Sequence, residues 1–244
     1  MNESATNGGL AAADRAADVK AQEDTRCSRD WFEYFKSRGI DNFPLFAFHY
    51  YSFRETTIGY VRKHVQQGGS VIELGCGSAL LAVLLSSMGY RVLAVDNDPR
   101  VVTMAKRNND RLGGNAKVEL MDLFSAHDLG RIFDLAYSEG VVEHFSGSRL
   151  KEAVRIHGEL GRKVMIVVPS QDDPLVTDQD TYSFKKLEDL CRSVGLVPID
   201  RFAMGTQLVK WPKLLLPPIV LKRLLGRQLK CENIGIVCRN PKYT

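Results

Sequence analysis

The feature that most constrains this chain is a glycine-rich stretch, Val71–Ala79, which joins an apolar strand-like run to a helix-like run. Gly75 and Gly77 allow the backbone to turn tightly and let a ligand approach it closely. The helix that follows begins with unpaired N–H groups, which favour polar or anionic ligand groups. The stretch therefore predicts a nucleotide-like ligand at the carboxyl end of a parallel strand.

The chain beyond this turn alternates between strand and helix patterns. Short apolar runs are typical of strands buried on both faces, and apolar residues spaced three or four positions apart indicate helices. Such alternation predicts an α/β fold with a doubly wound, mostly parallel sheet and helices on both faces. The expected strands are 71–74, 91–95, 117–121, 132–137, 163–168, 196–202 and 232–237, and the expected helices between them are 79–88, 99–109, 150–160 and 184–194.

The N-terminal part differs in character from the rest. Residues 1–25 are rich in Asn, Gly, Ala and acidic residues, which predicts a flexible tail. Asp30 and Glu33 have the spacing of a capping box, so a short helix is expected to begin there. An aromatic segment follows and leads into a helix that ends near Val65, before two glycines; its aromatic residues are Phe43, Phe46, Phe48, Tyr50, Tyr51 and Phe53. We expect residues 26–244 to form one domain.

Composition excludes several classes of protein. The hydrophobic fraction is 44% and the net charge is +4, spread along the chain, so no basic face for nucleic acid is predicted. The five cysteines include no Cys-x-x-Cys pair, which disfavours a zinc site or a disulfide framework and favours a reducing, cytoplasmic location. No secretory signal pattern or membrane-spanning apolar run is evident.

Acidic residues lie where the expected strands end. Glu73 is inside the first strand, where a carboxylate needs a partner such as a cationic ligand amine. Asp96 ends the second strand and is placed to accept hydrogen bonds from ribose hydroxyls. Asp98 precedes a proline and is expected to cap the next helix instead. The dinucleotide pattern Gly-x-Gly-x-x-Gly is incomplete, since Ala79 and Leu80 follow where a third glycine would be needed.

Four segments together resemble the motifs of class I S-adenosylmethionine-dependent methyltransferases. They are VIELGCGSALLA, the acidic end of RVLAVDNDP, VELMDLF and FDLAYSEGVVEHF, in the order and at the intervals usual in that family. The resemblance covers roughly residues 56–240. It implies the family's seven-stranded sheet with an antiparallel last strand, and S-adenosylmethionine as cofactor. Ala79 departs from the family pattern, which often has a third glycine there.

The resemblance also implies roles for individual residues. The methionine part of the cofactor would be held by Glu73 and by the turn residues Gly75, Cys76 and Gly77. Asp96 would bind the ribose, with Asn97 beside the adenine. Asp122 would accept from the adenine amino group, and the Leu123 backbone would face the ring. The sulfonium end would be lined by Ser138, Glu139 and Gly140.

Candidate catalytic residues lie near the expected acceptor. His144 has an imidazole suited to general base catalysis near neutral pH, although packing or helix capping would explain it equally well. His49 and Tyr50 belong to the aromatic segment, and in the family such a segment (here 26–66) often forms a lid; core packing is the alternative. Arg54 is placed either to reach the cofactor carboxylate or to form a surface ion pair. No cluster of metal ligands is evident.

The segment 208–230, between the last two expected strands, mixes apolar residues with Lys and Arg and is long for such a connection. A cap over the acceptor pocket is the favoured interpretation. A homodimer or membrane-contacting surface, or a helical excursion over the sheet edge, are the alternatives.

The sequence thus predicts a methyltransferase that acts on oxygen or nitrogen of a small-molecule acceptor. Nucleic acid as acceptor is disfavoured, because the Asn/Asp-Pro-Pro-Tyr signature is replaced by Ser138-Glu-Gly-Val. A nicotinamide-dependent oxidoreductase and a non-catalytic cofactor-binding subunit of the same fold are the alternative functions.

Overall fold

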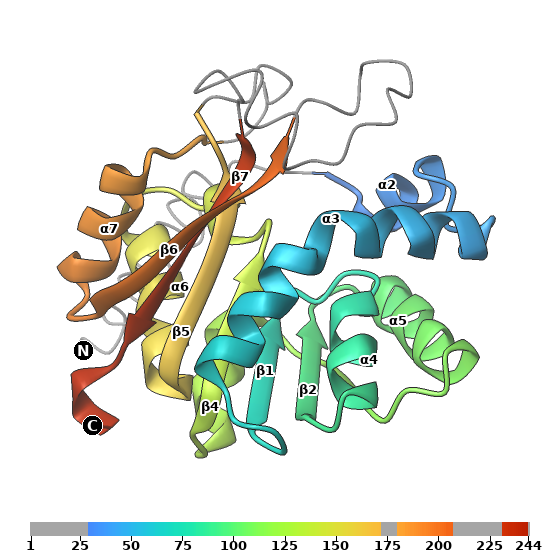
Figure 1. The fold of residues 1–244 in the computed structure, drawn as a ribbon, viewed down its shortest axis with the longest axis horizontal. Coiled ribbons are helices and arrows are strands. Elements are labelled where there is room, and N and C mark those ends of the chain that lie inside the picture. The colour runs from blue at the N-terminus through green and yellow to red at the C-terminus, as the bar shows by residue number, and fades with distance from the viewer. Residues whose placement is uncertain (1–28, 172–179, 207–230, 244) are drawn as a thin grey trace, which may run out of the picture.

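A computed structural model describes residues 29–171, 180–206 and 231–243 of the chain. Its strands form one seven-stranded sheet in the order β3-β2-β1-β4-β5-β7-β6 (Figure 1). Parallel pairing joins neighbours from β3 to β5, and β7 runs antiparallel to both β5 and β6. The expected doubly wound sheet with an antiparallel last strand is therefore confirmed.

The elements follow the alternation expected from the sequence, with three short 3₁₀ helices labelled η. In chain order they are α2 (Trp31–Ser37), α3 (Phe43–His64), β1 (Ser70–Leu74), α4 (Leu80–Ser87), β2 (Arg91–Asp96), α5 (Pro99–Arg111), β3 (Lys117–Leu120), η1 (Leu123–Leu129), β4 (Phe133–Glu139), η2 (Val142–His144), α6 (Gly147–Leu160), β5 (Gly161–Pro169), α7 (Phe184–Ser193), β6 (Val197–Thr206), β7 (Cys231–Arg239) and η5 (Pro241–Tyr243).

The sheet has a hydrophobic core on each face, because side chains alternate along its strands. On β1, Val71 packs with residues of α3, α4 and α5, whereas Ile72 and Leu74 pack with residues of α6 and α7. Four of the five residues of β1 are buried, as expected for a central strand covered on both sides. This burial fixes the strand's register and, with it, the position of the glycine turn that follows.

The aromatic segment is the first half of α3 rather than a separate element before a helix. Pro44 lies in the first turn, where its missing N–H costs nothing. At its other end, α3 is anchored to β6: Tyr60 stacks on Phe202 with ring centroids 4.2 Å apart, and Asp200 accepts from Lys63 and His64. In Figure 1, α3 crosses one face of the sheet and extends beyond β1 and β2.

Parallel pairing brings the carboxyl ends of β1, β2 and β4 to the same edge of the sheet. Glu73 lies opposite Ala94 on β2 and opposite Tyr137 on β4. The turns that leave these strands therefore meet, which is where this kind of fold binds its ligands. The expected N-terminal tail and the segment 208–230 lie outside the described residues. Within the described residues, no helix is both long and apolar enough to span a membrane.

Candidate functional site

The glycine turn after β1 is held by the end of β2. Gly75 and Gly77 have φ values of +69° and +53°, a region in which glycine has no steric penalty. The Gly77 N–H donates to Oδ2 of Asp96 at 3.0 Å, and the Cys76 N–H donates to the backbone oxygen of Val95 at 2.9 Å. The end of β2 thus fixes the shape of the turn.

The Asp96 carboxylate is a shared acceptor between two turns. Its Oδ1 accepts from the Asp98 N–H at 3.2 Å, while Oδ2 accepts from Gly77. Burial raises its pKa, and the N–H groups of Gly77 and Asp98 oppose that shift. Each oxygen retains acceptor capacity for a further donor such as a hydroxyl. The side chain of Asp98 caps α5 by accepting from the Arg100 N–H at 2.8 Å, as expected.

Glu73 is buried beneath this turn, with 5% of its surface exposed. Its Oε2 has no hydrogen-bond partner among the described residues. Burial raises its pKa to about 8, the charge of Glu139 adds to the shift, and Arg54 and the Ala82 N–H oppose it. A carboxylate in this position needs a cationic or hydrogen-bonding partner.

Arg54 of α3 is the cation that faces this cluster. Its Nη2 lies 2.7 Å from Oε1 of Glu139, and its guanidinium carbon lies 3.7 Å from the ring centre of Tyr50. The Tyr137 hydroxyl donates to the other oxygen of Glu139 at 2.6 Å. Burial disfavours the charge on Arg54, but Glu139, Tyr50, Tyr137 and Glu73 together outweigh that effect and raise its pKa. Burial also raises the pKa of Tyr50, so its hydroxyl stays protonated.

The short helix η2 places two buried polar residues after β4. Glu143 is fully buried, and neither of its carboxylate oxygens has a hydrogen-bond partner among the described residues. Burial raises its pKa to about 8, with a further contribution from Glu139. The ring of His144 is 7% exposed and meets the edge of Trp31, with centroids 5.2 Å apart. His144 therefore lies under the N-terminal helix α2.

Ser138 faces the opposite side of the sheet from Glu73 and Glu139. Its hydroxyl lies 2.8 Å from Nε2 of His157 on α6, whose Nδ1 lies 2.7 Å from the backbone oxygen of Ala153. A carbonyl can only accept, so Nδ1 carries the proton and Ser138 donates to Nε2. Burial lowers the pKa of His157 to about 4, which keeps the ring neutral. Only the backbone of Ser138 remains for the ligand side.

The turn after β3 presents the expected adenine-side residues. Asp122 is exposed, and its Oδ1 accepts from the Phe124 N–H at 2.7 Å, capping η1. Leu123 is buried in the core shared with α6, and Asn97 is exposed after β2. The Met121 N–H donates to the backbone oxygen of Asp96 at 2.9 Å, which joins this turn to the end of β2.

Helix α2 packs against the glycine turn. A Cβ on Gly77 would lie 2.7 Å from Cζ of Phe35, so the ring rests directly on the turn. Arg100 at the start of α5 contacts Asp30 at 3.0 Å and Asp98 at 2.7 Å. Asp30 is the N-cap of α2, so the first contact links the start of α2 to α5. The geometry therefore brings α2 together with Gly77, His144 and the start of α5.

A family comparison identifies this arrangement. Residues 71–159 match the model of a family described as a methyltransferase domain. The match includes the glycine turn, Asp96, Asp122 and the end of β4, so the resemblance to class I S-adenosylmethionine-dependent methyltransferases is confirmed. S-adenosylmethionine is the cofactor of this family.

Curated relatives of the methyltransferase domain share only part of their length with it. Ribosomal protein L11 methyltransferase of Thermosipho africanus is 42% identical over 85 residues, which is 34% of this chain and 32% of the relative. Ubiquinone biosynthesis O-methyltransferase of Methylocella silvestris is 30% identical over 78 residues, 32% of this chain and 30% of the relative. The chain thus spans about a third of the length of these relatives.

Solved methyltransferase structures share the fold at low sequence identity. Magnesium protoporphyrin IX methyltransferase of Synechocystis PCC 6803, with bound cofactor, has a TM-score of 0.60 and 14% identity, covering 88% of this chain and all of that one. A methyltransferase of Archaeoglobus fulgidus has a TM-score of 0.55 and 16% identity, covering 76% of this chain and 94% of that one.

The residues around the glycine turn, together with Arg54 of α3, suit S-adenosylmethionine. The Glu73 oxygen without a partner suits the cofactor's ammonium group, and Arg54 is a counter-charge for its carboxylate. Cys76 is not a candidate nucleophile, because burial raises the pKa of its thiol well above the usual value. Among the described residues, no group of three His, Cys, Asp or Glu side chains is placed to hold a metal ion.

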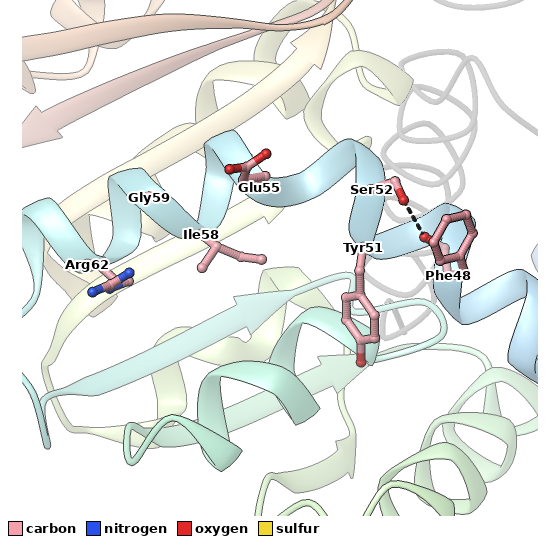
Figure 2. A pocket seen from close by; sticks show the side chains of 7 residues that line it. All are labelled: Phe48, Tyr51, Ser52, Glu55, Ile58, Gly59 and Arg62. Carbon is pink, nitrogen blue, oxygen red and sulfur yellow. Dashed lines mark hydrogen bonds between the residues drawn. The ribbon is translucent and has the colours of Figure 1, made fainter. Parts of the chain in front are cut away.

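A separate hollow of about 580 Å³ lies along α3. Figure 2 shows the side chains that line it. The hydroxyl of one of them, Tyr51, donates to the backbone oxygen of Leu80, at the start of α4, at 3.1 Å. None of the expected site residues lines the hollow. His49 and Tyr50 are adjacent in sequence to its lining residues, and His49 is exposed.

Several residues of the site were not expected from the sequence. No role was expected for Phe35, Tyr137 or Glu143. Glu143 directly follows the apolar run Gly140-Val-Val, and an acid at that position could have indicated a site residue. Contacts such as Phe35 with Gly77 join residues that no local pattern connects.

Proposed function

We propose that this chain is an S-adenosylmethionine-dependent methyltransferase that transfers a methyl group to oxygen or nitrogen of a small-molecule acceptor. The observation that carries the proposal is the glycine turn braced by Asp96, with the partnerless oxygen of buried Glu73 beneath it. A strand-to-helix turn held open by a carboxylate suits a nucleoside ligand, and a buried carboxylate suits the cationic end of that ligand.

Each part of the cofactor has residues suited to it in this proposal. Glu73, Gly75, Cys76 and Gly77 hold the methionine part, with Arg54 opposite its carboxylate. Asp96 binds the ribose, with Asn97 beside the adenine, and Asp122 and Leu123 bind the adenine. The sulfonium end is lined by Glu139 and Gly140, with Ser138 contributing its backbone.

The protein's part in the reaction is chiefly alignment and exclusion of water. When bound, the cofactor supplies an activated methyl carbon, and transfer is an in-line displacement that depends on orientation. Trp31 and Phe35 of α2 lie over the site and keep water out. In this proposal His144 accepts the acceptor's proton. Tyr50 remains protonated, so it serves as a hydrogen-bond donor rather than as a base.

The acceptor is proposed to be small because the net charge is modest. A protein acceptor is the second candidate, since a relative is named a ribosomal protein L11 methyltransferase. Incubation with labelled cofactor and either a panel of hydroxyl and amine compounds or ribosomal protein, followed by mass spectrometry, separates the two. Label on ribosomal protein alone would overturn the small-molecule assignment.

Calorimetry of cofactor binding tests the proposal directly. Asp96→Ala should weaken S-adenosylmethionine binding by at least about tenfold, because it removes both ribose acceptors and the brace on Gly77. Asp98→Asn is the matched control: it keeps a capping residue two positions away and should bind normally. Equal affinity in wild type and Asp96→Ala would contradict the ribose assignment.

Two further outcomes bear on the alternative functions. Binding of NADH without binding of S-adenosylmethionine would favour an oxidoreductase. Cofactor binding without transfer to any acceptor would favour a non-catalytic subunit. His144→Ala should lower turnover more than it lowers cofactor affinity, and full activity of that variant would make His144 structural.

A further inference from the structure

The carboxyl of Glu143 is a buried polar group to which the proposed function assigns no role. It is fully buried, and both of its oxygens lack a hydrogen-bond partner among the described residues. A buried carboxyl without a partner costs several kcal/mol if it is charged.

The Glu143 carboxyl is directed towards the end of β4. Its Oε1 lies 3.7 Å from the position that a Cβ on Gly140 would occupy. Gly140 follows Glu139, so Oε1 borders the part of the site proposed above for the sulfonium end. With a φ of +73° and no side chain, Gly140 leaves that approach open.

The charges around Glu143 leave it without a cation. The titratable group that acts on it is Glu139 of β4, and the N–H groups of Val141 and Glu143 partly oppose that effect. Arg54 of α3 is paired with Glu139, while Glu73 of β1 adds a third carboxyl to the cluster. His144 of η2 is its neighbour in sequence and packs on Trp31 of α2. Glu73 and Glu139 thus share one guanidinium, and the charge that acts on Glu143 is the negative charge of Glu139.

We propose that Glu143 is a binding residue for the positive charge of the cofactor's sulfonium, so that the site distinguishes the cationic cofactor from its neutral thioether product. The inference rests on the proposed function. S-adenosylmethionine carries one more positive charge than S-adenosylhomocysteine, and the two are otherwise alike except for the methyl group. A charged carboxylate beside the sulfur therefore favours the first over the second.

The proposal couples binding to a proton. In the free protein the pKa of Glu143 is about 8, so the carboxyl is largely protonated at pH 6.5. A bound cation lowers that pKa and releases the proton. The affinity for S-adenosylmethionine relative to S-adenosylhomocysteine therefore rises with pH until the free carboxyl ionises, near pH 8, and then levels off.

Calorimetric titration with both compounds at pH 6.5, 7.5 and 8.5 tests this. In the wild type we expect the affinity ratio of cofactor to product to rise roughly tenfold over this range. In Glu143→Gln the rise should disappear. Glu159→Gln, in which a partly exposed acid of α6 that pairs with Arg155 is neutralised, is the matched control and should behave like the wild type. Comparing variants cancels titration of the ligands' own amine groups.

The wild type alone provides a second measurement that does not depend on the variant folding. Titrations in two buffers of different ionisation enthalpy count the protons released, and S-adenosylmethionine should release more than S-adenosylhomocysteine. Equal proton release for the two compounds, or the same pH dependence in Glu143→Gln and wild type, would overturn the inference. Failure of both compounds to bind would instead overturn the proposed function.

Discussion

At the scale of single residues, Ala79 carries the clearest strain in the site. Its φ of +55° is the only positive value at a non-glycine residue among the described residues. The left-handed conformation costs an L-residue roughly 1–2 kcal/mol. Its methyl group is fully buried beside α4, which offsets part of that cost. The departure from the family's third glycine is therefore a strained alanine rather than a rearranged turn.

Replacing Ala79 with glycine tests this balance. Ala79→Gly relieves the strain but loses about 0.8 kcal/mol of methyl burial, so the free energy of unfolding should change by less than about 1 kcal/mol. Ala105→Gly is the matched control, because Ala105 is equally buried but lies within α5. It should lose about 2 kcal/mol, from burial and helix propensity together. Urea denaturation measures both free energies of unfolding. Equal losses in the two variants would contradict the interpretation that Ala79 is strained.

Residue roles were predictable from the sequence where a local rule applied. Asp98 before Pro99 indicated a helix cap, and Glu73 within an apolar strand indicated a carboxylate that needs a partner. The pairing of Arg54 with Glu139 was not predictable, because it joins α3 to β4 across a long sequence separation. For the same reason, the sequence did not indicate that the Ser138 hydroxyl is bonded to His157 of α6.

At the scale of elements, α2 depends on its docking. It has seven residues, none of them buried, and an isolated helix of that length is unstable in water. Phe35 on Gly77 and Trp31 on His144 supply its contacts with the site. The exposed ion pairs of Arg100 add little, since such pairs typically contribute less than about 1 kcal/mol. The helix is thus a cover whose stability comes from aromatic packing on the cofactor site.

Truncating Phe35 should loosen this cover selectively. Phe35→Ala removes ring contacts with Gly77 and with Phe46, so we expect faster amide hydrogen exchange in Trp31–Ser37 while the sheet stays protected. Hydrogen exchange followed by mass spectrometry measures both regions. Phe48→Ala is the control, because that ring is 66% exposed. Unchanged exchange in α2 would show that the helix is held in another way.

Most elements of the sheet were predictable, since apolar runs and helical periodicity agree with burial on two faces. The structure of the aromatic segment was harder to predict. Its rings have the spacing of one helix face, but they are partly exposed. Phe46 and Tyr50, four positions apart, contact each other within α3, with centroids 6.3 Å apart. The 3₁₀ helices η1 and η2 follow turns whose geometry is set by Asp96 and Gly140. Hydrophobic periodicity along the sequence does not predict such turns.

At the scale of the whole molecule, buried ionisable groups make stability depend on pH. Glu73 and Glu143 have pKa values near 8 in the folded state, against about 4.5 for an ordinary glutamate carboxyl. The folded chain therefore binds more protons than the unfolded chain between those values, and stability falls as pH rises through that range. His157, whose pKa is lowered to about 4, acts oppositely: stability is lost as pH falls from 6.5 through about 4.

These signs predict that the ligand-free protein loses thermal stability between pH 6.5 and 8.5, a window in which His157 stays neutral. The loss has an upper bound of about 1.4 kcal/mol per pH unit for each carboxyl. Scanning calorimetry should show a falling Tm in the wild type and a nearly flat one in the double variant Glu73→Gln with Glu143→Gln. Saturating S-adenosylmethionine should reduce the fall, because its positive charges stabilise both carboxylates in the folded state. A Tm that did not fall over this window in the ligand-free wild type would show that the two carboxyls are already ionised at pH 6.5, and it would remove the basis for their preference for a cation.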